Sequence, residues 1–202
     1  MIILSNSCLG GNLYKHFLKS EYKSVFVWNA IRYIDFFEIA SKFPNIDLSI
    51  KNLGIQDDSF AFVRLKNDMK ILFTHYHISE NSDIVQDGED VFSKDILLYT
   101  KAKYLSRYKR MEDAIKRKED KILAFQDTMF EFEPKKYGPI SENLVLKLLG
   151  LEGYKKKIIM TRYKALEKLS NDNVMIKGID AHIPPMTFLN EHKTEIKEFL
   201  NC

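Results

Sequence analysis

The chain of 202 residues lacks most of the features that assign a sequence to a specialised class of protein. Its two cysteines, Cys8 and Cys202, lie at opposite ends, so the sequence holds neither a disulfide framework nor a Cys/His zinc pattern, as fits a reducing cytosol. No segment approaches the ~20 consecutive apolar residues that span a bilayer, and the N-terminal apolar run is too short for a signal peptide and has no basic leader. The net charge of +3, from 31 basic and 28 acidic residues, is too balanced to indicate nucleic-acid binding. We therefore expect a cytoplasmic protein without a transmembrane segment, for which peripheral attachment to a membrane surface stays open.

The composition is that of an ordinary globular protein. Hydrophobic residues make up 45% of the chain, which suffices for a full core. Short apolar runs alternate with amphipathic stretches, a pattern typical of an α/β fold. We expect one α/β domain over residues 1–202, a three-layer α/β/α sandwich with a Rossmann-like, mixed but mostly parallel sheet. Residues 133–202 would complete this sheet and end in a helix.

Periodicity and turn residues locate the elements of this fold. Continuous apolar runs predict buried strands, and Lys66-Asn67-Asp68 predicts the turn of a β-hairpin. The acidic stretch 80–90 is expected to be a mobile loop. Strands are expected at 2–4, 25–28, 60–65, 69–76, 121–125, 157–161 and 174–176, and helices directly after Gly11 and at 31–40, 95–118, 141–149 and 186–200.

The heptapeptide S-N-S-C-L-G-G at residues 5–11 is the most informative part of the chain. It follows an apolar run and is typical of a strand–turn–helix junction, which in open α/β sheets lies at the edge where ligands bind. There, a helix N-terminus favours the thiolate of Cys8. Gly10 and Gly11 allow a substrate to approach the backbone closely, or permit unusual backbone angles. Because free cysteines are usually packing residues, Cys8 is either a functional thiol or part of the core.

Two histidines, His75 and His77, end the predicted strand that begins at Met69. Alternation along a strand puts both on one face. If this strand is a parallel neighbour of the first strand, one histidine reaches the Cys8 thiol as a general base or pairs with its thiolate. Otherwise one is a core residue and the other is solvated. With Cys8 they would form a zinc site that lacks a fourth ligand, so we expect no metal.

The predicted helix 95–118 has an unusual face, on which Tyr104, Arg107, Tyr108 and Met111 lie at helical spacing. An arginine between tyrosines suits a bidentate grip on a carboxylate or phosphate. The diphosphate of a nucleotide sugar and the phosphates of coenzyme A are suitable anions, which Arg110 would also contact. The alternative is an arginine paired with an acid at the edge of the core.

Two further polar residues lie at the same predicted sheet edge. Asp127 follows the strand 121–125 and either orients a histidine, as the third member of a triad does, or caps a helix, which is the commoner use of such an aspartate. Asn6, beside the cysteine, is a candidate donor to a developing oxyanion.

Three blocks of the sequence resemble a bacterial family of unknown function. The opening S-N-S-C-L-G-G, with Tyr14 nearby, is similar to the S-N-N-C-W-G-G start of that family, whose members are commonly described as exopolysaccharide biosynthesis proteins. F-T-H-Y-H at 73–77 resembles its histidine block, and Y-L-S-R-Y-K-R at 104–110 resembles its aromatic-x-x-Arg-x-x-Arg helix. The resemblance covers roughly residues 1–132.

The match has departures, since Leu9 and Tyr104 stand where tryptophan is common and Ser7 replaces an asparagine. The resemblance implies a three-layer α/β protein from a capsule or surface-polysaccharide locus. The opening also has a weaker similarity to capsule-locus acetyltransferases that carry a cysteine after the first strand.

Taken with the resemblance, these residues favour an acyltransferase that modifies a surface polysaccharide or its nucleotide-sugar precursor. Cys8 would take the acyl group from a coenzyme A thioester, and His75 or His77 would activate the thiol and then the sugar hydroxyl. Asn6 and the amides near Gly10 would hold the oxyanion, and the two arginines would bind the donor phosphates. One alternative is a glycosyl or phosphoglycosyl transferase, disfavoured by the lack of a D-x-D motif. Another is a non-catalytic sugar- or nucleotide-binding partner within a polysaccharide-biosynthesis complex.

Overall fold

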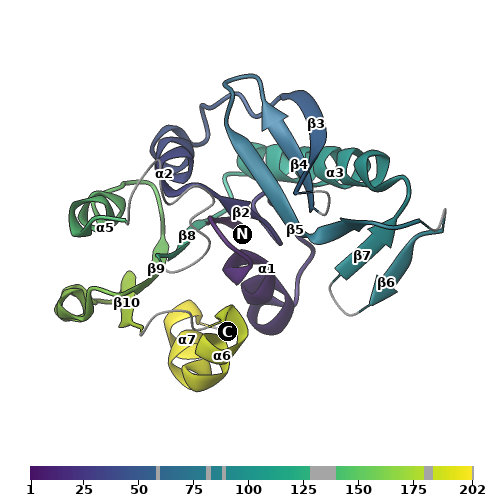
Figure 1. Cartoon of the computed structure of the whole chain (residues 1–202). Helices are drawn as coiled ribbons and strands as arrows, with labels where there is room; N and C mark the ends of the chain where they lie inside the picture. The colour runs from purple at the N-terminus through teal and green to yellow at the C-terminus, as the bar shows by residue number, and fades with distance from the viewer. Residues whose placement is uncertain (58–59, 81–82, 88–89, 128–139, 180–183, 202) are drawn as a thin grey trace.

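Two β-sheets and the helices around them make up the protein (Figure 1). The computed structural model describes residues 1–57, 60–80, 83–87, 90–127, 140–179 and 184–201. The mixture of helices with a largely parallel sheet confirms the predicted α/β class. Where the sequence pattern suggests one sheet, however, the structure divides the strands between two.

The first sheet, which we call the parallel sheet, contains the strands with continuous apolar runs. In spatial order these are β1 (Ile2–Ser5), β8 (Lys121–Gln126), β9 (Lys156–Thr161) and β10 (Val174–Gly178), and all neighbours are parallel. Both faces are buried, because alternate residues enter two separate hydrophobic clusters: Ile3 and Ile122 enter one, Leu4 and Leu123 the other. The strands predicted in these four regions are confirmed.

Helices cover both faces of the parallel sheet, so this part of the molecule has three layers. One cluster holds side chains of α1 (Leu9–Leu13), α6 (Pro185–Glu191) and α7 (Lys193–Leu200). The other holds side chains of α2 (Tyr33–Lys42), α5 (Glu142–Leu149) and the 3-10 helix η2 (Lys164–Leu169). Helix α1 continues directly as the π-helix η1 (Tyr14–Leu18), and the predicted helix 186–200 is broken in two at His192.

The second sheet, which we call the mixed sheet, has the spatial order β3 (Ile50–Gln56), β4 (Phe60–Leu65), β5 (Lys70–Ile78), β7 (Asp90–Ser93) and β6 (Val85–Asp87), and β2 (Ala30–Ile31) also pairs with β5. The predicted hairpin of β4 and β5 is confirmed. The loop expected at 80–90 is wrong at β6 and at the first residue of β7, because β7 pairs with β5 and β6 pairs with β7. Residues 81–82 and 88–89 of that expected loop lie outside the described residues.

The long helix α3 (Ile96–Lys116) packs on the mixed sheet and confirms the predicted helix 95–118. Its buried residues include Tyr104, Arg107 and Met111, as the predicted face requires, with Tyr108 packed at the edge of the core. Within the described ranges, no helix, α3 included, has both the length and the apolar character needed to cross a membrane.

The segment 25–28 departs from its prediction. Val25, Phe26, Val27 and Trp28 are all buried, yet they form no strand, and Trp28 has a positive φ of 56°. In a strand, the backbone carbonyls of this segment would accept hydrogen bonds from a neighbouring strand. Here a side chain donates instead: Asn29 Nδ2 donates to Val25 O (3.1 Å). The apolar run therefore reports burial correctly but not backbone conformation.

Candidate active site

The thiol of Cys8 lies in hydrogen-bond contact with an imidazole. Cys8 Sγ is 3.1 Å from Nε2 of His75 and 3.3 Å from Oγ1 of Thr74. Cys8 is 8% exposed, so its thiol is almost buried, and the His75 side chain is 24% exposed. This is the distance at which a histidine can accept the proton of a nucleophile.

An aspartate occupies the other side of the same imidazole. Nδ1 of His75 is 2.9 Å from Oδ1 of Asp90, the first residue of β7. Thiol, imidazole and carboxylate thus follow one another in the order of a catalytic triad, which is recognised by its geometry rather than by its place in the sequence. Sequence reasoning missed Asp90 because it fell in the predicted loop. The one sequence feature that could have indicated Asp90 is its position directly before Val91-Phe92-Ser93, a short apolar/polar pattern typical of a strand.

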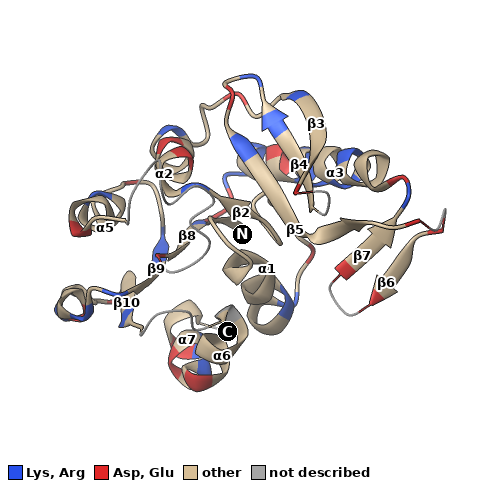
Figure 2. Ribbon diagram, viewed as in Figure 1, with Lys and Arg blue, Asp and Glu red and all other residues tan. Residues whose placement is uncertain are grey.

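The second histidine, His77, contacts the same carboxylate and not the thiol. Its Nε2 is 3.2 Å from Oδ1 of Asp90, and its ring stacks on Phe92 (centroids 4.9 Å apart) and packs against Phe60 (5.1 Å). Both histidines therefore lie on one face of β5, as alternation predicts. The structure distinguishes their positions: His75 faces Cys8, and His77 holds Asp90. Asp87 and Asp90 make the facing ends of β6 and β7 acidic (Figure 2).

A bulge in β5 aims two successive residues at one sulfur. The pairing with β4 passes from Phe60↔His77 directly to Ala61↔Phe73, so residues 74–76 have no partner in that ladder. In a regular strand Thr74 and His75 would point to opposite faces. Bulges commonly redirect side chains beside active sites, and here both side chains reach Cys8 Sγ.

The sequence predicts a contact between Cys8 and a histidine if their strands are parallel neighbours. The contact is present, but β1, which precedes Cys8, and β5, which carries His75, belong to different sheets. The short strand β2 connects them. Ile31 N donates to the carbonyl of Asn6 (3.0 Å), next to the cysteine, while Ile31 pairs with Ile71 of β5. The site is therefore assembled at the junction of the two sheets.

The two glycines after Cys8 make room for protein atoms. A Cβ on Gly11 would lie 2.5 Å from two ring carbons of Trp28, and one on Gly10 would lie 2.7 Å from Cβ of Ser5. Both glycines are in helix α1. Trp28 in turn packs edge-on against His75, with ring centroids 5.3 Å apart. Gly11 thus lets the indole reach the imidazole.

The polar groups before Cys8 bind the chain itself. Asn6 Nδ2 donates to the carbonyl of Gln126 (2.8 Å), and Asn6 Oδ1 accepts from the Gln126 amide (3.0 Å). The Ser5 hydroxyl accepts from the amide of Gly10 (3.2 Å). Of the groups expected to hold an oxyanion, Asn6 thus fixes the turn to β8, and the Gly10 amide bonds to Ser5 just before the turn.

The predicted anion-binding residues of α3 also have partners within the protein. The buried Tyr104 hydroxyl donates to Leu48 O (2.7 Å), and burial raises its pKa. Arg107 donates to Val27 O (3.2 Å) and to the Tyr76 hydroxyl (2.9 Å). Arg110 Nε donates to Tyr22 O (2.9 Å). These three side chains fasten chain segments to α3.

Asp127 lies at the end of β8, apart from the histidines. Its Oδ2 accepts from the Thr161 hydroxyl (2.5 Å) and from the Arg162 amide (2.7 Å). These bonds join the ends of β8 and β9. The carboxylate that orients His75 is Asp90 instead.

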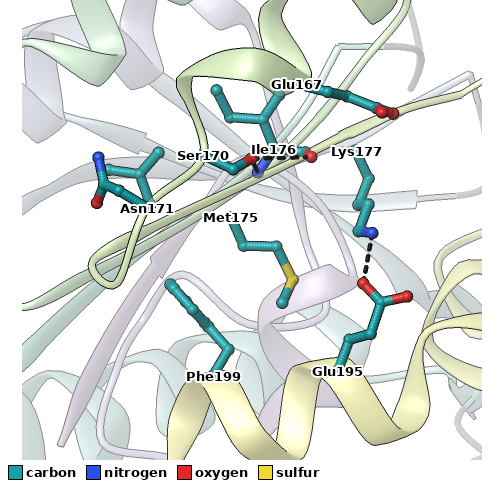
Figure 3. A pocket seen from close by; sticks show the side chains of 9 residues that line it. Glu167, Ser170, Asn171, Met175, Ile176, Lys177, Glu195 and Phe199 are labelled. Atoms are coloured by element: carbon teal, nitrogen blue, oxygen red, sulfur yellow. Dashed lines mark hydrogen bonds and ion pairs between the residues drawn. The ribbon is translucent and has the colours of Figure 1, made fainter.

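A separate opening of about 280 Å³ lies between β10 and α7 (Figure 3). Met175 and Phe199 line it, and the ion pair of Lys177 with Glu195 stands at one side. It shares no residue with the Cys8 site. In the part of the chain that the structure describes, no group of three or more His, Cys, Asp or Glu side chains is placed to hold a metal ion.

Comparisons with known proteins supply no family for this chain. No protein-family model matches it, and no curated protein does so.

Proposed function

We propose that the protein is an acyltransferase that carries the acyl group on Cys8. The supporting observation is the chain of contacts from Cys8 Sγ through both ring nitrogens of His75 to Asp90, at 3.1 and 2.9 Å. A nucleophile beside a base that a third group orients is the arrangement that covalent acyl transfer requires.

In the first half-reaction, His75 Nε2 takes the thiol proton and the Cys8 sulfur attacks the carbonyl carbon of a thioester donor. A new C–S bond forms, the donor's C–S bond breaks, and the leaving thiolate takes the proton from His75. In the second half, His75 removes the proton of an acceptor hydroxyl, whose oxygen attacks the acyl-Cys8 carbonyl. Cys8 leaves and recovers its proton from His75. Asp90 accepts from Nδ1–H throughout and stabilises the charged ring.

The donor and acceptor are proposed on the chemistry of a thioester and on the sequence resemblance. Coenzyme A thioesters are the proposed donors, and a hydroxyl of a capsule or exopolysaccharide precursor is the proposed acceptor. Neither Arg107 nor Arg110 is proposed to bind the donor phosphates, because both guanidinium groups donate hydrogen bonds to other residues of the protein. We place the reaction in the cytoplasm, alongside partner proteins of polysaccharide biosynthesis.

Trapping of the acyl-enzyme tests this proposal. A Cys202→Ser protein, which keeps Cys8 as its one thiol, is incubated with acetyl-coenzyme A, quenched in acid and measured by intact-mass and peptide mass spectrometry. We expect one acetyl group on Cys8, removed by hydroxylamine. Cys8→Ala should form none, and His75→Asn should form it about 10²–10⁴-fold more slowly, the usual contribution of a general base.

Thr74→Val is the matched control, since it removes a second hydrogen-bonding group beside Cys8 Sγ and leaves the base in place. It should still form the adduct. Acetyl transfer to a sugar at full rate by Cys8→Ala would contradict the proposed acyl-Cys8 intermediate. Binding of a nucleotide sugar, with no binding of coenzyme A, would instead favour a glycosyl or phosphoglycosyl transferase in which Cys8 only lines the site.

A further inference from the structure

A buried segment without regular structure carries the indole that packs on His75. Residues 21–29 form neither helix nor strand, although Val25, Phe26 and Val27 are fully buried. Buried backbone carbonyls need hydrogen-bond partners. Helix α3 supplies two of them: Arg107 donates to Val27 O and Arg110 to Tyr22 O.

Arg107 holds both sides of the Trp28–His75 contact with one guanidinium group. Its Nη1 donates to Val27 O, directly before Trp28, and its Nη2 donates to the hydroxyl of Tyr76, directly after His75. Since the guanidinium is planar and rigid, these two bonds fix the distance between the two chain segments. Lysine, with one flexible ammonium group, cannot reproduce this geometry.

The burial of the Arg107 guanidinium group is unfavourable for stability. The residue is 5% exposed, and its partners within the described residues are neutral: a carbonyl, a hydroxyl and the rings of Tyr22 and Tyr76, whose centroids lie 5.6 and 5.9 Å from its Cζ. Burying a cation without an acid partner costs stability, which contacts with aromatic faces only partly offset. A leucine or methionine would fill the space without this penalty.

We propose that Arg107 is a positioning residue that holds Trp28 against His75, so that the imidazole keeps facing the Cys8 thiol. This inference rests on the proposed acyl transfer through Cys8. Arg110 supports the arrangement from one turn further along α3, because it fixes Tyr22, whose ring packs edge-on against Trp28 with centroids 6.2 Å apart.

Trp28 is the only tryptophan of the chain, so its fluorescence reports this contact directly. In the Cys202→Ser protein, we would compare Arg107→Gln and Arg107→Lys with Lys109→Gln, an exposed residue of the same helix. The readouts are Trp28 emission, its quenching by acrylamide, and the rate at which iodoacetamide alkylates Cys8. His75→Asn provides the reference for an indole that has lost its imidazole partner.

Both Arg107 variants should shift Trp28 emission, increase its quenching and slow Cys8 alkylation on the order of 10-fold, since small displacements of a catalytic group have large effects on rate. Lys109→Gln should match the parent. A purely structural role would lower the melting temperature and leave the emission and alkylation of the folded protein unchanged, and that result would overturn the proposal.

Tyr76→Phe keeps the proposal testable if the Arg107 variants do not fold. It removes one acceptor of Arg107 and preserves the ring, so it should change Trp28 emission in the same direction and to a smaller extent. No change in this folded variant would again contradict the inference. If Cys8→Ala retains full transferase activity, the proposed function fails, whereas the fluorescence result still decides whether Arg107 positions Trp28.

Discussion

The two sheets contribute to the site in different ways. The parallel sheet delivers Cys8 from a turn in which Ser5, Asn6 and Ser7 are buried and hydrogen-bonded. The mixed sheet delivers His75 and Asp90 from a bulge and a strand end, where their side chains are 24% and 43% exposed. The proposed nucleophile is thus held by a buried hydrogen-bonded segment, whereas the proposed base and its carboxylate partner are partly exposed.

The largest expected difference between the sheets is in stability. Leu123→Ala on β8 removes a fully buried side chain and should lower the free energy of unfolding by about 2–5 kcal/mol. Val85→Ala on β6 changes a side chain that is 43% exposed and should stay within about 0.5 kcal/mol of the parent. Urea denaturation measures both. Equal losses would show that the outer hairpin belongs to the stabilising core.

A smaller loss is expected at the junction of the sheets. Gly11→Ala drives a methyl group into the Trp28 ring and should lower the free energy of unfolding by about 1–3 kcal/mol, as overpacking does. Thermal unfolding followed by circular dichroism gives the change, and Trp28 fluorescence shows whether the indole moves.

Gly150→Ala is the matched control. It lies just after α5, and a Cβ there would meet its nearest atom at 3.5 Å, an ordinary contact. It should be tolerated. A Gly11→Ala protein as stable as Gly150→Ala, with unchanged fluorescence, would show that Trp28 is not held where the structure has it.

The smallest expected effect is electrostatic and depends on pH. Burial raises the pKa of the Glu119 carboxyl, but hydrogen bonds from the Met1 amino group, Lys23 and Arg117 outweigh it and bring the pKa from 4.5 to about 2. Because the folded-state pKa is the lower one, Glu119 stabilises the fold above pH 4.5, and this contribution disappears as the pH falls to about 2. Urea denaturation across this range should show the loss in the parent and a smaller one in Glu119→Gln.

The hairpin of the mixed sheet offers the comparison for this prediction. A hydrogen bond from Lys51 lowers the pKa of Asp68, but the pair is exposed and screened by solvent. Asp68→Asn should therefore change the pH dependence of stability less than Glu119→Gln does. The reverse order would mean that the cluster around Glu119 contributes little.

Much of the parallel sheet could be predicted from the sequence, because its strands are local apolar runs and its helices have clear periodicity. The same local signals put Cys8 in a strand–helix turn and the two histidines on one strand face. The mixed sheet is harder to predict, since the β5–β7 pairing is parallel and β7 follows a polar stretch of the sequence.

The rest of the site depends on tertiary contacts that no local pattern contains. Asp90 becomes the partner of His75 only through strand pairing, and the bulge at 74–76 has no marker in the sequence. Arg107 has the spacing of a ligand-binding residue, yet its partners come from Val27 and Tyr76, far away in the chain. The apolar run 25–28 predicts a strand that would include Trp28, because a buried irregular segment and a buried strand have the same apolar sequence pattern.

We propose that Cys8, His75 and Asp90 act as one unit across the two sheets. The most direct measurement is the rate of Cys8 alkylation by iodoacetamide in the Cys202→Ser protein, followed by mass spectrometry at one pH, for His75→Asn, Asp90→Asn and the double variant. We expect each single change to slow alkylation and the double variant to be no slower than His75→Asn alone, because the effects of groups in one network are not additive. Rates that equal the parent, or effects that simply multiply, would contradict it.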